Sequence, residues 1–99
     1  MREFDLSRFT WEYIGRLHED FSIEALYFRL LCGTEVNFIY NGKSYWVTCD
    51  YNSGILFYEP NKLETEVVYK DRDDFVNNCY IDGVNICDLW DEVHVEDWS

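Results

Sequence analysis

The chain has 99 residues, of which 47% are hydrophobic and 19% aromatic, enough apolar surface for the core of one domain but too few residues for two. Twenty acidic against eight basic residues give a net charge of −12, which disfavours direct binding of nucleic acid or an anionic membrane and favours a basic partner. The sequence has neither a long apolar span nor an apolar leader, so we expect a soluble, cytoplasmic protein without a membrane partner.

Residues 1–20 have no decisive pattern. Phe9, Tyr13 and Leu17 would share one face of a helix, but Gly15 weakens helix formation. We therefore expect either a short N-terminal helix or an arm attached to a single domain that spans 1–99.

The first well-marked element is a helix over 22–32. Ser22 can accept a free backbone N–H as the N-cap, and Glu24 complements the helix dipole in the first turn. Gly33 stands where a left-handed residue would end the helix. The side chains expected on its buried stripe are Ile23, Leu26, Tyr27, Leu30 and Leu31.

A β-hairpin follows the helix. Asn41-Gly42 tolerates the two positive φ angles of a type I′ turn, which predicts that strand 35–40 pairs with strand 43–49. The more apolar face of this hairpin should be the core, and it carries Val36 and Phe38 opposite Val47 and Tyr45. Ile39 and Trp46 fall on the other face, where they are exposed unless another element covers them.

Two further strands are predicted at 55–59 and about 65–70, each rich in β-branched and aromatic residues. Consecutive strands commonly pair with one another, so the simplest assembly is an antiparallel meander of three or four strands. The predicted fold class is therefore α+β: the meander packs against the helix at 22–32, and short C-terminal helices flank it.

The C-terminal part is predicted to hold two short helices. Asp71 can cap the first, which runs to about residue 78, and Asn85 can cap the second. The second helix should turn Ile86, Leu89, Trp90 and Val93 inward. The tail at 93–98 fits either an extension of this helix or a strand.

Negative charge concentrates in the C-terminal half. Residues 50–99 hold thirteen acids and three bases, a net charge of −10, and no Lys or Arg follows Arg72. One interpretation is an ordinary solvated surface with acids placed at helix N-termini. The other is a surface for a basic partner, formed by Asp88, Asp91, Glu92 and Glu96 together with Asp73 and Asp74. An alternative surface is the apolar pair Ile39 and Trp46.

Signatures of catalysis or metal binding are weak. The four cysteines, at positions 32, 49, 79 and 87, lack the close pair of a zinc site, so we expect no metal. Because we expect a cytoplasmic protein, we also expect these thiols to be reduced. His18-Glu19-Asp20 could be interpreted as a general-base cluster, but the sequence favours a polar loop before the helix cap. We therefore expect a protein that is not an enzyme and has no cofactor.

The run from residue 21 to 98 resembles small bacterial and phage proteins in its capped helix at 22–31, its Tyr40-Asn41-Gly42-Lys43 hairpin, and Ile81-Asp82-Gly83 leading into Leu89-Trp90-Asp91-Glu92. In size and acidity the chain resembles phage anti-CRISPR proteins and the immunity proteins that neutralise toxins. That resemblance implies a stoichiometric inhibitor of a nucleic-acid-processing enzyme. The alternative is an adaptor or immunity-type protein that binds through its apolar patch.

Overall fold

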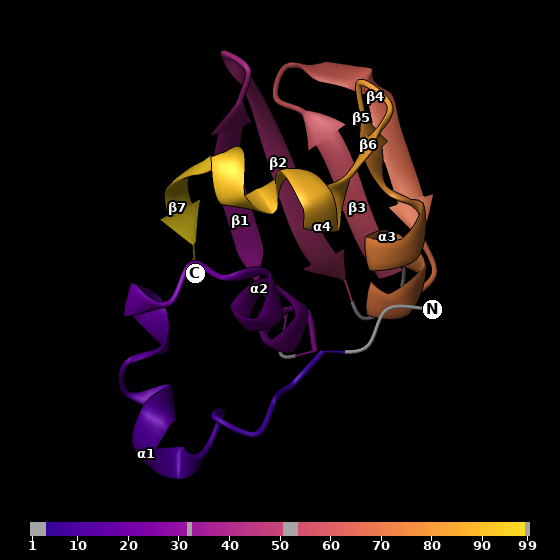
Figure 1. Ribbon diagram of the computed structural model, residues 1–99. Helices are drawn as coiled ribbons and strands as arrows, with labels where there is room; N and C mark the ends of the chain where they lie inside the picture. Colours follow the sequence, from indigo (N-terminus) through magenta and orange to yellow (C-terminus); the bar gives the residue numbers. More distant parts are fainter. Residues whose placement is uncertain (1–3, 32, 51–53, 99) are drawn as a thin grey trace.

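The computed structural model describes residues 4–31, 33–50 and 54–98, and it has the predicted α+β fold (Figure 1). Its main sheet is antiparallel, with five strands in the order β4-β3-β2-β1-β7. The strands are β1 (Glu35–Tyr40), β2 (Lys43–Asp50), β3 (Gly54–Glu59), β4 (Lys62–Tyr69) and β7 (His94–Trp98). Strands β1 to β4 form the expected meander, and β7 returns from the C-terminus to add a fifth strand beside β1.

The remaining elements are short. They are α1 (Trp11–Ile14), η1 (Leu17–Glu19), α2 (Ile23–Arg29), α3 (Arg72–Asn78), α4 (Ile86–Leu89) and η2 (Trp90–Glu92), with a small hairpin of β5 (Tyr80–Ile81) and β6 (Val84–Asn85). Among the described helices, none is long and apolar enough to cross a membrane.

The central hairpin confirms the predicted register. Asn41 and Gly42 have φ angles of 52° and 78°, as a type I′ turn requires. Phe38 pairs with Tyr45, and Val36 pairs with Val47. All four of these side chains are buried, so the core face was assigned correctly.

Helix α2 begins as predicted but ends early. The Ser22 hydroxyl accepts the backbone N–H of Ala25 at 3.2 Å. Leu30 is the C-cap, and Gly33 adopts the left-handed conformation (φ 76°) only after the helix has ended. The prediction that Leu31 lies on the buried stripe is wrong, because a residue beyond the last helical turn no longer follows the helical period, and Leu31 is 59% exposed.

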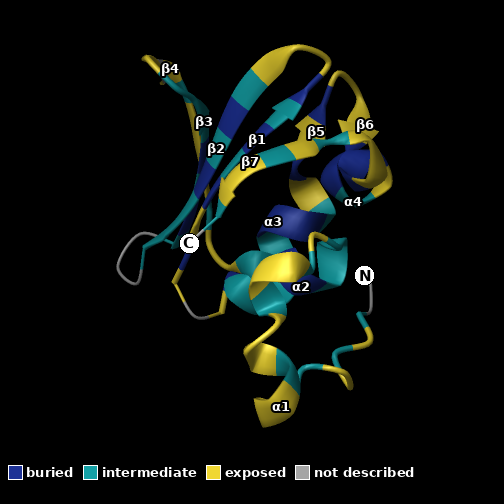
Figure 2. Ribbon diagram, turned by 90° about the vertical axis from the view of Figure 1, so that its left-hand side faces the viewer, coloured by how far each residue is buried: buried dark blue, intermediate teal, exposed yellow. Residues whose placement is uncertain are grey.

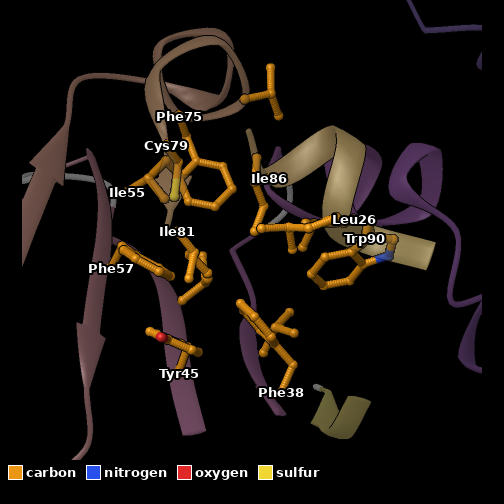
Figure 3. Close-up of a cluster of buried hydrophobic side chains, with 14 of the residues drawn as sticks. Leu26, Phe38, Tyr45, Ile55, Phe57, Phe75, Cys79, Ile81, Ile86 and Trp90 are labelled. Atoms are coloured by element: carbon orange, nitrogen blue, oxygen red, sulfur yellow. The ribbon is translucent and has the colours of Figure 1, made fainter. Parts of the chain in front are cut away.

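The molecule has two layers. Helices α2, α3 and α4 all lie against one face of the sheet, and no described element covers the other face (Figures 1 and 2). Phe38 is fully buried between the layers, with its ring centroid 5.6 Å from that of Tyr45 and 5.2 Å from that of Trp90 (Figure 3). Trp90 also donates its indole N–H to the carbonyl of Phe21 at 2.7 Å, which ties the C-terminal helices to the entrance of α2.

The second C-terminal helix is capped by Asn85 as predicted, and the tail takes the strand alternative rather than extending the helix. The helical segment stops at Glu92, and Val93 is already extended, with φ −85° and ψ 152°. Val93 and Val95 are β-branched and fit a strand better than a helix, and β1 offers an open edge with which 94–98 can pair. Trp98 thereby reaches the core face, where it packs against the core cluster.

Candidate partner-binding surfaces

The first candidate surface is the acid ridge, by which we mean Asp88, Asp91 and Glu92 on α4 and η2. All three residues are exposed. Ile86, Leu89 and Trp90, which alternate with them along the chain, are at most 3% exposed. The predicted separation of apolar residues inward and carboxylates outward is therefore present, although the second half of the ridge is a 3-10 turn.

Asn85 fixes the position of the acid ridge. Its side-chain oxygen accepts the backbone N–H of Cys87 at 3.0 Å and so caps α4, as expected. Its amide nitrogen also donates to the carbonyls of Val76 at 3.0 Å and Cys79 at 3.4 Å. A single buried side chain therefore joins the end of α3 to the start of α4.

Asp73 and Asp74 lie apart from the acid ridge, in the first turn of α3. Asp73 accepts the hydroxyl of Tyr27 at 2.6 Å. Asp74 accepts the backbone N–H of Lys70 at 3.0 Å and the amide of Asn78 at 2.7 Å, and these two bonds lower the pKa of Asp74. Both carboxylates thus have intramolecular partners, which makes them the weakest members of the predicted partner-binding set.

Glu96 belongs to β7 rather than to a helix. The pairing of β7 with β1 shifts between Asn37 and Phe38, whose partners are Asp97 and Val95, so Glu96 is the extra residue of a β-bulge. Glu96 and Asp97 are both exposed on this outermost strand. The carboxylates predicted from the sequence therefore continue along the chain from the acid ridge onto the edge of the sheet.

The second candidate surface is the open face, by which we mean the side of the sheet that lacks helices. Ile39 and Trp46 lie there as predicted and are partly buried. The ring centroid of Trp46 is 6.1 Å from that of Tyr58 on β3. Val68 on the edge strand β4 is 53% exposed. The apolar patch therefore extends beyond the two residues named from the sequence.

A small hollow of about 50 Å³ opens beside Trp46 and was not foreseen from the sequence. The residues that line it are Glu35, Val36, Asn37, Trp46 and Asp97. The hairpin register alone places Glu35 and Asn37 on the same face as Trp46, but Asp97 joins them only because β7 pairs with β1. No local sequence pattern indicates that long-range pairing.

Three of the described arginines, Arg8, Arg29 and Arg72, are engaged around α2. Arg8 contacts Asp20 at 3.0 Å, and the guanidinium of Arg72 lies 4.0 Å from the centroid of the Tyr27 ring. Arg29 lies over Trp98 at 4.2 Å. Within the described part of the chain, no ion pair joins a base to Asp91, Glu92 or Glu96.

The His18-Glu19-Asp20 segment forms the polar loop before α2. His18 and Glu19 have largely exposed side chains. Asp20 accepts hydrogen bonds from Tyr13, from the backbone N–H of Ser22 at 3.0 Å and from Arg8 at 3.0 Å. Partial burial raises the pKa of Asp20, but these bonds outweigh it and bring that pKa to about 2. Such a carboxylate is a weak base at neutral pH, so its geometry suits a structural role.

The thiols also have structural surroundings. Cys79 is fully buried, and this burial raises the pKa of its thiol to about 12. Cys49 donates its thiol to the carbonyl of Leu30 at 3.2 Å. Cys32 lies outside the described residues. Where the structure is described, no group of three or more His, Cys, Asp or Glu side chains is placed to hold a metal ion.

Comparison with protein families, with curated protein sequences and with solved structures finds no match to this chain. The acid ridge, the open face and the hollow beside Trp46 are therefore the observations from which a function can be inferred.

Proposed function

We propose that the protein is a non-catalytic, acidic binding protein that acts in the cytoplasm as a stoichiometric inhibitor of a nucleic-acid-processing enzyme, in the manner of an anti-CRISPR protein. The observation that supports this proposal is the acid ridge. Asp88, Asp91 and Glu92 are exposed there, and the acids continue as Glu96 and Asp97 on β7. No Lys or Arg interrupts this stretch of the chain.

The spacing of these carboxylates suits mimicry of a nucleic-acid strand. In an α-helix, side chains at i, i+3 and i+4 lie roughly 5–6 Å apart. Asp91 and Glu92 stand on a 3-10 turn, but Asp88 and Asp91 are still neighbours at i and i+3, with a spacing comparable to that of successive phosphates on one strand. A basic channel that attracts phosphates would attract this surface too, and the attraction would act mainly on the association rate and would weaken with salt. Asp88, Asp91 and Glu92 repel one another in the unbound protein, so a basic partner relieves a cost already present.

The test neutralises the surface and follows both folding and binding. The variant Asp88→Asn/Asp91→Asn/Glu92→Gln/Glu96→Gln raises the net charge by four. A matched control, Glu12→Gln/Glu64→Gln/Glu66→Gln/Asp82→Asn, raises it equally at exposed acids elsewhere. The free energy of unfolding of both variants should lie within about 0.5 kcal/mol of the wild-type value, because substitutions of exposed surface residues usually change stability little.

Binding should separate the two variants. Wild-type and control proteins immobilised as baits should capture the same enzyme from extracts of the native host, with and without phage infection, as identified by mass spectrometry. The ridge variant should lose it. Added DNA or RNA and raised salt should both compete with capture by the wild type. Equal capture by the ridge variant, or capture indifferent to salt and nucleic acid, would refute mimicry.

The second candidate is an adaptor or immunity-type protein that binds through the open face. The observation that favours it is the exposure of Val68 on β4, which lies on the same uncovered face of the sheet as the aromatic pair Trp46 and Tyr58. The variant Ile39→Ser/Trp46→Ser should then lose the captured partner. Such binding should change little with salt, since apolar contact is not screened by ions.

A further inference from the structure

The hollow beside Trp46 lies in a row of side chains that crosses three strands. Asn37 on β1 pairs with Trp46 on β2 and, on its other side, with Asp97 on β7. Glu35 precedes Asn37 by two residues on β1 and therefore projects from the same face. Directly opposed side chains in such rows have Cβ atoms about 4.5–5.5 Å apart, and Glu35, Asn37, Trp46 and Asp97 all line the one hollow.

The polar groups around this spot match a cation. Glu35 and Asp97 line the hollow with carboxylates. Asn37 lines it as well, and its side-chain oxygen is buried and has no hydrogen-bond partner. A buried acceptor without a donor is costly, by about 1–3 kcal/mol, and a ligand that brings an N–H group would remove this cost.

The aromatic wall and the volume narrow the choice of cation. A single water needs roughly 10–15 Å³ of cavity, so about 50 Å³ admits the four heavy atoms of a guanidinium group. A planar guanidinium can stack on the ring of Trp46 while its forked N–H groups reach carboxylate and amide oxygens at the rim. An ammonium group is compact and more strongly hydrated, so it uses the flat indole face less well.

We infer that the hollow lined by Glu35, Asn37, Trp46 and Asp97 binds the guanidinium group of an arginine side chain of the partner protein. This inference rests on the proposed function, because that function supplies a basic partner. It adds the residue that the partner contributes and a contact point on the open face, beyond the β7 edge that carries Glu96.

The test uses a small probe and needs no partner. The ¹⁵N-labelled full chain is titrated at pH 7.5 with Nα-acetyl-arginine N-methylamide while the indole N–H of Trp46 and the backbone amides of Asn37 and Asp97 are followed. We expect saturable shifts of these signals at millimolar probe. The citrulline derivative, which has nearly the same shape but no charge, should produce none.

Variants localise the site. Glu35→Gln/Asp97→Asn should weaken binding of the probe at least tenfold. Asp97→Asn alone should also weaken it measurably, and this single variant keeps the site testable if the double variant does not fold. The matched pair Asp91→Asn/Glu92→Gln removes the same charge from the acid ridge and should change the affinity less than twofold.

Each other result counts against the inference. An equal loss of probe affinity in the two double variants would show that the net charge of the protein, rather than a specific site, attracts the probe. Equal binding of the acetyl-lysine derivative would refute the preference for guanidinium, and absence of saturable shifts would refute the site itself. The titration uses a small probe in place of the partner, so a negative result would overturn the arginine site without bearing on the acid-ridge experiment. Conversely, a negative acid-ridge experiment would not change what the titration shows about the hollow.

Discussion

Replacing Asn85 tests how α4, and with it the acid ridge, is held in place. The side chain is 92% buried, since its relative exposure is 8%, and it both caps α4 and donates to the last carbonyls of α3. Asn85→Ala removes the cap, at about 1 kcal/mol. It also leaves the buried carbonyl of Val76 with only a weak thiol donor, Cys87 at 3.7 Å, which costs about 1–2 kcal/mol more. The carbonyl of Cys79 keeps the backbone N–H of Ile86 at 2.9 Å and adds little.

Asn85→Ala should therefore lower the free energy of unfolding by about 2–3 kcal/mol, a large part of the roughly 5–15 kcal/mol that stabilises a domain of this size. A loss of this size corresponds to a fall in Tm of about 10–20 °C. Urea unfolding followed by tryptophan fluorescence measures it. Asn85→Ser restores a capping oxygen but is too short to reach α3, so it should recover about 1 kcal/mol. Asn85→Asp keeps the cap but sets a carboxylate against the α3 carbonyls, so at pH 7 it should be no more stable than Asn85→Ala. A loss below 0.5 kcal/mol in Asn85→Ala, or an Asn85→Asp variant close to the wild type, would refute this account.

Three further predictions concern the core, the thiols and the N-terminal arm. Phe38→Ala should cost about 3–5 kcal/mol in urea unfolding because Phe38 is fully buried, whereas Ile39→Ala, at the next residue but on the open face, should cost far less; similar values would contradict the face assignment. Thiol titration in denaturant without reductant should count four thiols, and in the native protein Cys79 should be the slowest to react, since burial withholds it and raises its pKa to about 12. Asp20 has a folded-state pKa near 2 against an ordinary value of 3.8. The contribution of its carboxylate to the free energy of unfolding is therefore fully present above about pH 4 and is lost as pH falls from 4 to 2. The stability gap between wild type and Asp20→Asn should accordingly shrink over that range, and a gap that stays constant would contradict it.

Local signals account for the part of the fold that could be predicted from the sequence. Asn41-Gly42 fixes the register of β1 with β2 within a few residues of the turn. The helix caps Ser22 and Asp71 act on N–H groups three residues away, and Asn85 acts on one two residues away. In each case the interacting groups are neighbours in the chain, so the residue type alone identifies the geometry.

The main missed features depend on groups far apart in the sequence. β7 pairs with β1 across more than fifty residues, and the alternation in His94-Val95-Glu96-Asp97-Trp98 cannot say which edge it will join. The exposure of Leu31 is a local exception, since it follows from where α2 stops. The acid ridge was predictable because it needs only a helical turn with an apolar inner side. The hollow was not, because one wall comes from β7.

The bulge at Glu96 decides which side chains of β7 reach each face of the sheet. If β7 continued in the register that pairs Val95 with Phe38, Asp97 would oppose Val36 on the core face and Trp98 would turn to the open face. The extra residue reverses this: Trp98 opposes Val36, and Asp97 opposes Asn37. One insertion thus gives the core an indole, which lies 5.3 Å from the ring of Phe21, and gives the hollow its second carboxylate. Glu96 and Asp97 are exposed on β7, and their charges disfavour pairing of this edge strand with another copy of the chain. Under the proposed function, a basic partner that contacted both the acid ridge and the hollow would cross this acidic edge.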